Sequence, residues 1–259
     1  YIFILERSFL CYQFLLMVAM VKWDKKLFPK CKNMRIWHFF GGFDKEDTGK
    51  FTFPVYTDFS KVTEYPDVII DFSVPVATLS VLSFAKAHHI PVVIATTGFS
   101  EEQQKQIHAY AKDIPIFQSS NMSFEIHLMT KVLKMVSLAL ADESDIEIIE
   151  THHNRKIDAP SGTALMLAGS INEAMQNRYT YDFDRMQKRE KRSPKEIGFS
   201  SIRGGNIVGE HTVQFLSQNE TFEITHKAYS RKVFADGSLK AARFLIGKPN
   251  GFYTMDDLM

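Results

Sequence analysis

The sequence predicts an α/β fold in which a parallel sheet is followed by a mixed, partly antiparallel sheet. Two observations lead to this prediction. Between residues 68 and 150, short apolar runs alternate with segments of helical periodicity, the pattern that right-handed βαβ units produce. Later in the chain, Thr212–Leu216 and Thr221–Thr225 flank a short polar stretch, as the strands of an antiparallel hairpin do. A parallel sheet followed by an antiparallel piece favours two domains.

The elements of the parallel part follow one another at regular spacing. Its expected strands are short apolar runs, which suit a sheet buried on both faces: Val68–Phe72, Pro91–Ala95 and Ile114–Phe117. A further strand is expected at Asp145–Glu150, where apolar and acidic residues alternate. The expected helices cover residues 76–89, 100–112, 122–141 and 236–246. Ser100 and Gln103 form a capping-box pattern at the start of the second helix.

The composition excludes several classes of protein. Of the 259 residues, 45% are apolar and 13% are aromatic, which is too much material for burial in a disordered chain. Lys and Arg total 31 against 30 Asp and Glu, so the net charge of +1 offers no basic excess for nucleic acid. The two cysteines, Cys11 and Cys31, fit neither a disulfide scaffold nor a zinc motif, and a reducing, cytoplasmic setting is expected.

An apolar run, Phe9–Val21, lies near the start of the sequence. Its 13 residues are fewer than the ~20 that a membrane-spanning helix needs. The charges before it cancel and no clean small-residue cleavage site follows, so the run lacks the marks of a signal peptide. We therefore expect a buried helix, or a segment outside the fold, and no membrane association.

The segment 150–164 holds the residues best suited to chemistry. It follows an expected strand and precedes an expected helix, which is where open α/β sheets bind their ligands. Four potential cations lie within it: His152, His153, Arg155 and Lys156. Because like charges repel at this spacing, an anionic ligand such as a carboxylate would stabilise the segment. The alternative is a solvated basic turn without a ligand.

A helix start occupies the second half of the same segment, at Ser161, Gly162 and Thr163. Backbone N–H groups and the helix dipole attract anions at such a position. A small dicarboxylate would satisfy both the basic residues and the helix start. The alternative is that Ser161 simply caps the helix.

A metal site is a weaker interpretation of this segment. Its candidate ligands are His152, His153 and Asp158. Adjacent residues of an extended segment point to opposite sides, and no cysteine or carboxylate cluster joins these three. We therefore expect no resident metal ion.

Two loops at the ends of neighbouring expected strands suit the close approach of a cofactor. Residues 95–98 read Ala-Thr-Thr-Gly, and residues 119–122 read Ser-Ser-Asn-Met. Small and hydroxyl-bearing residues at two strand ends are more informative than at one, although turns use the same residues. Residues 203–205 and 209–211 form two further loops that contain glycine, for which backbone geometry alone is a serious alternative.

Taken together, these motifs resemble the bacterial 4-hydroxy-tetrahydrodipicolinate reductase family, also called dihydrodipicolinate reductase. The most specific string is His-His-x-x-Lys-x-Asp-Ala-Pro-Ser-Gly-Thr-Ala at residues 152–164. The other matching motifs, collinear over residues 41–259, are Asp71–Ser73, Thr96–Phe99, Asn121–Ser123, Glu147–Glu150, Arg203–Gly205, Ile207–His211 and Thr225–Lys227.

The resemblance implies a reductase that uses NADH or NADPH to convert 4-hydroxy-tetrahydrodipicolinate to tetrahydrodipicolinate in lysine and diaminopimelate biosynthesis. It implies a Rossmann-like nucleotide domain from residues 1–123 and 231–259. Residues 124–230 would form the domain that binds the small dicarboxylate substrate and builds a homotetramer. Neither nucleic acid nor a membrane is an expected partner.

The resemblance also implies roles for individual residues. The acid/base histidine falls on His152 and the second proton donor on Lys156. Contacts to the substrate carboxylates fall on His153, Gly162 and Thr163. Contacts to the cofactor fall on Asp44, Lys45, Ala95, Thr96, Thr97, Ser119, Ser120, Asn121, Met122 and Arg231.

The resemblance ends abruptly before residue 41. Family members open with a strand and a glycine-rich loop for the cofactor pyrophosphate, whereas none of the 13 glycines lies in residues 1–40. Asp44 would hold ribose hydroxyls, and Lys45 would meet a 2′-phosphate. A reading-frame error or a wrongly joined segment upstream of about Phe40 explains the break, and real divergence is the alternative. Either way, we expect the sheet to lose a central strand and the cofactor to lose its phosphate cradle.

Two other functions remain open at this point. One is a non-catalytic, dicarboxylate-binding protein that kept the substrate domain and lost the cofactor. The other is a different Rossmann-type dehydrogenase, for example one that acts on an amino acid. The string at residues 156–164 argues against the second alternative.

Overall fold

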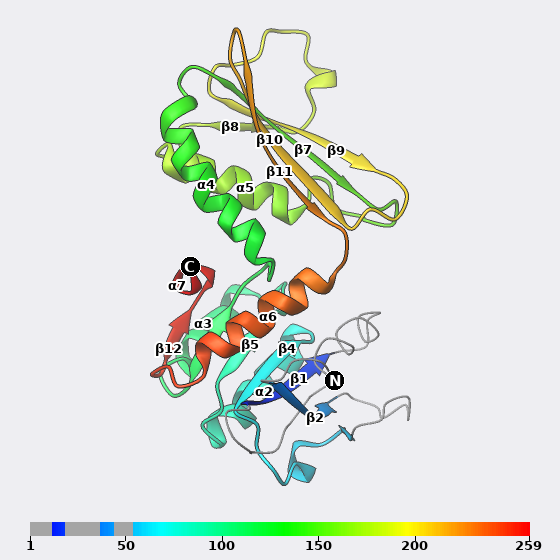
Figure 1. Cartoon of the computed structure of the whole chain (residues 1–259), viewed down its shortest axis with the longest axis vertical. Coiled ribbons are helices and arrows are strands. Elements are labelled where there is room, and N and C mark those ends of the chain that lie inside the picture. The colour runs from blue at the N-terminus through cyan, green and yellow to red at the C-terminus, as the bar shows by residue number, and fades with distance from the viewer. Residues whose placement is uncertain (1–11, 19–36, 44–53) are drawn as a thin grey trace. The chain divides into compact units, whose positions relative to one another are not determined.

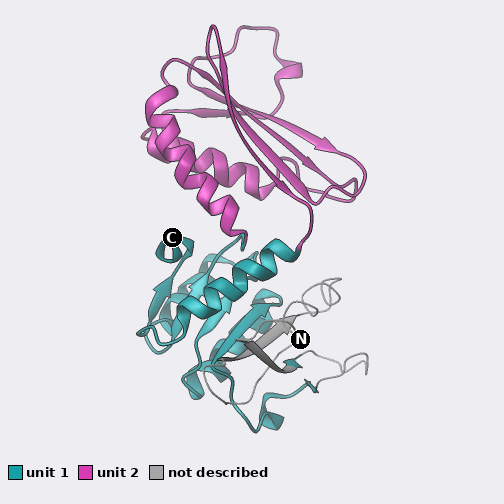
Figure 2. Cartoon of the chain, in the orientation of Figure 1, with its two compact units in different colours: residues 1–122, 232–259 teal, residues 123–231 magenta. Residues whose placement is uncertain are grey.

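A computed structural model describes residues 12–18, 37–43 and 54–259 (Figure 1). The chain divides into two compact units (Figure 2). Unit 1 combines residues 1–122 with residues 232–259, and unit 2 comprises residues 123–231. The expected boundaries, 1–123 with 231–259 and 124–230, differ from these by one residue at each junction. Among the described helices, none is long and apolar enough to cross a membrane.

Unit 1 is built on a seven-stranded sheet in the order β12-β6-β5-β4-β1-β2-β3, and every neighbouring pair is parallel. Its strands are β1 (Tyr12–Val18), β2 (Trp37–Phe43), β3 (Val55–Tyr56), β4 (Val68–Phe72), β5 (Val92–Ile94), β6 (Pro115–Gln118) and β12 (Gly251–Tyr253). Its helices are η1 (Phe59–Lys61), α2 (Pro75–Ala87), α3 (Glu101–Tyr110), α6 (Lys232–Leu245) and α7 (Met255–Leu258). The parallel sheet that the sequence predicts is confirmed.

Helices cover both faces of this sheet. On β4, Val68 and Ile70 point to one face and pack in the same cluster as Leu239 of α6. Ile69, between them, points to the other face and packs with residues of α2 and α3, including Leu82 and Ile107. Because both sides are buried, β4 is apolar at nearly every position rather than alternating.

Strand β1 corrects two expectations. The sequence predicts a helix, or no place in the fold, for Phe9–Val21, and it predicts the loss of a central strand. Instead, Tyr12–Val18 forms a strand between β4 and β2 and pairs in parallel with both. A central parallel strand is typically apolar throughout, so periodicity alone does not separate it from a buried helix. Residues 19–36, where the connection to β2 runs, lie outside the described residues.

Unit 2 is built on a mixed five-stranded sheet in the order β11-β10-β7-β9-β8. Its strands are β7 (Asp145–His152), β8 (Thr180–Asp182), β9 (Glu196–Arg203), β10 (Gly209–Leu216) and β11 (Thr221–Ala228). Its helices are α4 (Phe124–Leu140), α5 (Gly162–Ala174) and η2 (Arg185–Gln187). β10 is antiparallel to β11 and to β7, whereas β9 is parallel to β7 and to β8. The hairpin and the mixed sheet are confirmed, whereas β8 and β9 were not predicted.

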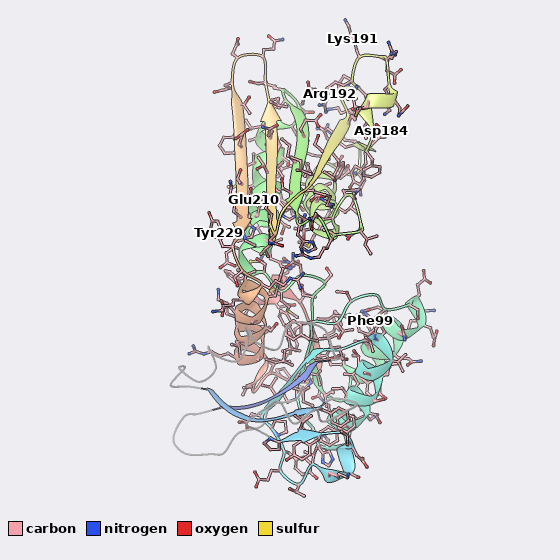
Figure 3. The ribbon with its side chains drawn as sticks, turned by 90° about the vertical axis from the view of Figure 1, so that its right-hand side faces the viewer. Phe99, Asp184, Lys191, Arg192, Glu210 and Tyr229 are labelled. Atoms are coloured by element: carbon pink, nitrogen blue, oxygen red, sulfur yellow. The ribbon has the colours of Figure 1, made fainter. Side chains whose placement is uncertain are left out.

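The two faces of the unit 2 sheet differ. On one face, Ile148 and Phe215 pack with Leu133 of α4 and Leu167 of α5. The opposite face carries polar cross-strand contacts, among them a 2.9 Å contact between the hydroxyls of Thr212 and Thr225. Arg192, in the segment that joins β8 to β9 (Figure 3), forms ion pairs with Asp145 and Glu147 at one end of β7. Successive residues of β7 alternate between these two faces, including the last residues of the strand.

Candidate active site

Side chains on β7 alternate between the two faces of the sheet, and near the end of the strand this alternation places two polar side chains on the helix-covered face. Glu150 and His152 follow Ile146 and Ile148 at every second position and are buried with them. Glu150 is only 1% exposed and His152 only 8%. A buried carboxyl group is costly unless other groups donate hydrogen bonds to it.

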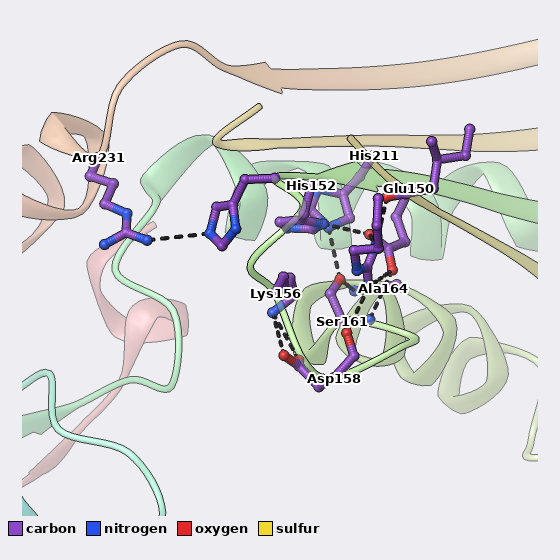
Figure 4. A network of polar contacts seen from close by, with 11 residues as sticks. Glu150, His152, Lys156, Asp158, Ser161, Ala164, His211 and Arg231 are labelled. Atoms are coloured by element: carbon purple, nitrogen blue, oxygen red, sulfur yellow. Dashed lines mark hydrogen bonds and ion pairs between the residues drawn. The ribbon is translucent and has the colours of Figure 1, made fainter. Parts of the chain in front are cut away.

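The Glu150 carboxylate receives donors on both oxygens (Figure 4). Arg203 of β9 donates from Nη1 to Oε2 at 2.9 Å and from Nη2 to Oε1 at 2.7 Å. The backbone N–H of Ser161 lies 3.2 Å from Oε1, and Nδ1 of His152 lies 2.5 Å from Oε2. Burial alone raises the pKa of Glu150, but the hydrogen bonds from His152 and Arg203 outweigh it and hold this pKa well below its usual range.

An ionised Glu150 fixes the proton arrangement of His152. A carboxylate only accepts hydrogen bonds, so Nδ1 of His152 carries the hydrogen. Its Nε2 is then the nitrogen that can gain or lose a proton. Nε2 lies beside Gly209, where a Cβ atom would come within 3.1 Å of it.

A second histidine, His211 of β10, lies beside this pair. Its ring and the His152 ring are edge to face, with centroids 5.1 Å apart. Nε2 of His211 lies 3.1 Å from the Ser161 hydroxyl. Burial, aided by the charge of His152, lowers the pKa of His211 to about 3. His211 is therefore neutral near pH 7 and adds no positive charge to the site.

The side chains of Glu150, His152 and His211 form the one group, within the described part of the chain, with the spacing of a metal site: their ligand atoms lie within 4.8 Å of one another. The guanidinium group of Arg203 already contacts both Glu150 oxygens. A metal cation would have to displace that charge or sit against it, so this cluster is better described as a carboxylate–imidazole network.

The basic residues after β7 are better compensated than the sequence indicates. Lys156 pairs with Asp158, with Nζ 2.8 Å from each carboxylate oxygen. Arg155 donates to the Asn206 side chain at 3.0 Å, and His152 is paired with Glu150 as described above. Repulsion among four unpaired cations is therefore not a valid argument for a bound anion, because acidic partners from the same segment reduce it.

His153 lies on the other side of the chain from His152. The Arg231 guanidinium group approaches its Nε2 at 3.5 Å (Figure 4). Burial, together with the charges of Arg155 and Arg231, lowers the pKa of His153. The sequence assigns Arg231 to the cofactor, whereas the structure places it beside a residue assigned to the substrate.

The helix start that the sequence predicts is present. Ser161 is the N-cap of α5, and its hydroxyl accepts a hydrogen bond from the Ala164 N–H at 3.2 Å. Gly162 and Thr163 form the first turn, and Gly162 is exposed. Ser161 does more than cap the helix, because it also contacts Glu150 and His211. The structure thus brings the predicted residues 152, 153, 156, 162 and 163 to one end of the unit 2 sheet.

Six of the predicted cofactor residues of unit 1 border a cavity of about 360 Å³: Ala95, Thr96, Thr97, Ser120, Asn121 and Met122. It lies beyond the carboxyl ends of β4, β5 and β6. Its lining comprises Phe72, Ser73, Val74, Pro75, Ala95, Thr96, Thr97, Ser120, Asn121, Met122 and Phe234. Ser119 does not line it; its hydroxyl donates to the Asn121 carbonyl at 2.7 Å and shapes the loop. Ser119 instead borders a second cavity of about 350 Å³, together with Thr96, Thr97 and Ser120.

The chemistry of the larger cavity fits the nicotinamide end of a dinucleotide. Phe72, Met122 and Phe234 offer apolar surface for a flat ring, and Thr97 and Asn121 offer polar groups for its carboxamide. Asp44 and Lys45 lie outside the described residues, as does the segment where a pyrophosphate loop is expected.

Two family models match the chain, one for each unit. Dihydrodipicolinate reductase, N-terminus, matches residues 40–122, and dihydrodipicolinate reductase, C-terminus, matches residues 125–259. The chain belongs to the dihydrodipicolinate reductase family. Reductases of this family use NADH or NADPH, so the expected oxidoreductase class and cofactor are confirmed. The match begins at residue 40, which is where the sequence changes character.

Curated relatives of the dihydrodipicolinate reductase family agree with this assignment. A 4-hydroxy-tetrahydrodipicolinate reductase from Caldanaerobacter subterraneus subsp. tengcongensis is 50% identical over 218 residues, which is 84% of this chain and 86% of the relative. One from Clostridium novyi is 46% identical over 220 residues, with the same coverage. These names support a reductase and lend no support to a non-catalytic protein.

A solved structure confirms the fold of the dihydrodipicolinate reductase family in this chain. A dipicolinate-bound dihydrodipicolinate reductase from Paenisporosarcina sp. TG-14 has a TM-score of 0.77 at 22% identity. The comparison covers 94% of this chain and 98% of that one. The Rossmann-like parallel sheet with an accompanying mixed sheet is therefore the correct fold class.

No role is predicted from the sequence for Glu150, Arg203 or His211, which form the buried network. All three lie in motifs that match the dihydrodipicolinate reductase family, at residues 147–150, 203–205 and 207–211. That match was the available signal. Two registers bring these motifs together: that of β7 with β9, which pairs His152 with Arg203, and that of β7 with β10, which pairs Glu150 with His211.

Proposed function

We propose that this chain catalyses the reduction of 4-hydroxy-tetrahydrodipicolinate to tetrahydrodipicolinate, with NADH or NADPH, in lysine and diaminopimelate biosynthesis. In the overall reaction one hydride and one proton enter, and the hydroxyl group leaves as water. The observation that carries the proposal lies in unit 2. There a histidine with a fixed proton arrangement lies next to a helix start and a half-buried loop lysine, Lys156.

The substrate-binding roles follow from charge and geometry. The first turn of α5, in which Gly162 is exposed, presents backbone N–H groups to one carboxylate, with the positive end of the helix dipole behind them. Gly162 and Thr163 provide this turn, and His153 lies at the same end of the sheet. Gly162 has open space where a Cβ would be, so a ligand can come close to its backbone.

Proton transfer is assigned to two side chains. His152 exchanges a proton at Nε2 because Nδ1 is committed to Glu150. Lys156 is the second donor, and its three hydrogens allow it to keep Asp158 as a partner while it donates to the substrate. The reaction needs a proton donor, because hydride addition to an unsaturated carbon–nitrogen ring leaves electron density on the substrate that a proton must neutralise.

When bound, the reduced nicotinamide supplies the hydride. The cavity residues Phe72, Met122 and Phe234 would hold its ring and exclude water, and Thr97 and Asn121 would orient its carboxamide. The remaining predicted contacts, Ala95, Thr96, Ser119 and Ser120, would complete the walls.

Substitution of the two proton-transfer residues tests the proposal. His152→Gln and Lys156→Met should each lower kcat by about 10²–10⁴-fold and leave NADH affinity within about twofold. Lys134→Met is the matched control, since Lys134 also forms one ion pair, with Glu173, but lies on α4. Turnover that survives both substitutions would show that the assigned roles are wrong.

A fluorescence titration of the purified full chain with NADH and NADPH tests the cofactor. Micromolar binding would support the reductase and would mean that residues 1–40 contribute a working phosphate site. Absence of binding by folded protein would refute the reductase for this chain and leave a dicarboxylate-binding protein. Under either outcome pyridine-2,6-dicarboxylate should bind the unit 2 site, and where turnover is measured it should compete with the substrate.

We further propose that the protein works as a cytoplasmic homotetramer. The sheet face of unit 2 opposite α4 and α5 supports self-association, because Ile202 is 51% exposed and pairs in register with Thr151 on that face. Analytical ultracentrifugation should give four times the 29.7 kDa chain mass. A monomer at micromolar concentration would exclude it.

A further inference from the structure

Glu150 has a role that the assigned proton-transfer residues do not cover. We propose that Glu150, held by Arg203, is a positioning residue that orients His152 and links it to the substrate-binding start of α5. This inference rests on the proposed function for its catalytic meaning, but its structural content can be tested separately.

The hydrogen-bonding positions of the Glu150 carboxylate are all occupied. An ionised carboxylate has about four lone-pair positions. Glu150 has four donors at hydrogen-bond distances of 2.5 to 3.2 Å, two from Arg203, one from Ser161 and one from His152, and the Ser201 side chain of β9 is a further hydrogen-bond partner. The donors come from β7, β9 and the N-cap of α5. With every position occupied, the carboxylate cannot rotate without losing a hydrogen bond.

Arg203 fixes the orientation of this carboxylate. Its two terminal nitrogens contact the two oxygens of Glu150 side by side, at 2.9 and 2.7 Å, which is the bidentate geometry that fixes the plane of a carboxylate. Nη2 also donates to the Asp158 carbonyl at 2.6 Å. The same guanidinium group therefore ties Glu150 to the loop that carries Lys156.

Ser161 connects Glu150 to the start of α5. Its N–H donates to Glu150 and its hydroxyl caps α5, so one residue joins the carboxylate to the helix start. A shift of Glu150 would move His152 and the first turn of α5 together. The buried Glu150 carboxylate thus fixes the position of His152 Nε2 relative to the first turn of α5, which we propose binds a substrate carboxylate.

The opposite face of β7 offers a matched control. Glu147 lies three residues earlier on the same strand and also pairs with an arginine, Arg192. It has no histidine partner among the described residues, and it lies at the far end of the strand from His152. Glu147→Gln therefore removes a similar charge pair without touching the proposed network.

The test combines nitrogen NMR of the histidine side chains with kinetics on the full chain. At alkaline pH, wild-type His152, identified by its loss in His152→Gln, should carry its hydrogen on Nδ1. In Glu150→Gln the amide NH2 group can face Nδ1 and reverse this arrangement. The kcat/KM for 4-hydroxy-tetrahydrodipicolinate should fall by about 10²-fold or more, whereas Glu147→Gln should keep the wild-type tautomer and stay within about twofold.

The outcomes separate the two proposals. Hydrogen on Nε2 in the wild type, or wild-type turnover in Glu150→Gln, overturns the positioning role even if the reductase activity is present. A tautomer change in Glu150→Gln with no turnover by the wild type supports the positioning of His152 and refutes the proposed reaction. If Glu150→Gln fails to fold, the tautomer of His152 in the wild type still decides whether Glu150 positions it. In addition, Arg203→Lys keeps the positive charge but loses the bidentate contact with Glu150, and it should lower kcat/KM by about tenfold.

Discussion

Gly237 provides the most direct test of how α6 is packed in unit 1. A Cβ atom at this position would lie 1.6 Å from the backbone oxygen of Met122 and 2.8 Å from its carbonyl carbon. Real Cβ atoms essentially never approach another heavy atom within 3.0 Å, so α6 or the Met122 backbone must move by about 1.4 Å to accept alanine. Met122 and Asn121 both line the larger cavity of unit 1, so this shift reaches the cavity to which we assign the cofactor.

The expected cost of Gly237→Ala follows from two opposing effects. Overpacking of a buried position costs about 1–3 kcal/mol, and the upper end applies because the obstacle is backbone, which cannot rotate away. Alanine in a helix interior is favoured over glycine by about 1 kcal/mol. The net loss of stability is therefore about 2 kcal/mol, which lowers the Tm by about 4–8 °C for a chain of this size.

Thermal unfolding followed by circular dichroism measures this effect, and an NADH titration measures its consequence. Gly169→Ala is the matched control, because Gly169 lies inside α5 and has nothing within 4 Å of the added Cβ. This control should gain about 0.5–1 kcal/mol. Gly237→Ala should melt lower and bind NADH more weakly. A Gly237→Ala protein that melts at or above the wild-type temperature would refute the packing argument.

Three further predictions concern unit 2. Gly209→Ala places a Cβ 3.1 Å from Nε2 of His152 and should lower kcat/KM by about tenfold or more; unchanged steady-state kinetics would contradict proton exchange at Nε2. Gly162→Pro removes one N–H from the first turn of α5, while Ser161, at φ −69° and ψ 152°, already has the backbone that precedes proline. Its affinity for pyridine-2,6-dicarboxylate should fall by about 10-fold or more at unchanged Tm, and calorimetric titration that finds no loss would exclude this turn as the carboxylate site. His211 has a pKa of about 3 when folded against about 6.5 when unfolded, so the unfolded chain binds the extra proton between these values. Its contribution to stability is complete above pH 6.5 and declines as the pH falls through this window, by about 1.4 kcal/mol per pH unit. Urea unfolding at pH 7 and pH 5 should show a smaller pH dependence in His211→Gln, and an equal dependence would contradict the assignment.

The strands and helices with clear periodicity could be predicted from the sequence. Val68–Phe72 is apolar because both faces are covered, and α3 begins where the capping box of Ser100 and Gln103 indicates. β9 could not be predicted, because Glu196–Arg203 mixes charged, glycine and serine residues and shows no clean alternation. The helix predicted for the segment that contains Tyr12–Val18 is wrong, because a central strand and a buried helix have the same apolar character.

In the candidate site, too, some parts could be predicted from the sequence and others could not. His152, Lys156 and the start of α5 lie in one continuous string, so their proximity is a local property of the sequence. The contact between Glu150 and Arg203 spans 53 residues and depends on the register of β7 with β9. No local pattern encodes a register between strands so far apart. Arg203, which holds Glu150 and through it the proton arrangement of His152, is therefore visible as a partner only in the folded chain.

The division of unit 1 into two chain segments has a consequence for the order of folding on the ribosome. Translation delivers the parallel strands β1 to β6 first, but α6, which buries Val68 and Ile70, follows more than 100 residues later. Unit 2, residues 123–231, is continuous and leaves the exit tunnel complete before then. All of unit 2 therefore emerges before α6 does, and the sheet of unit 1 keeps one apolar face uncovered until α6 has left the tunnel.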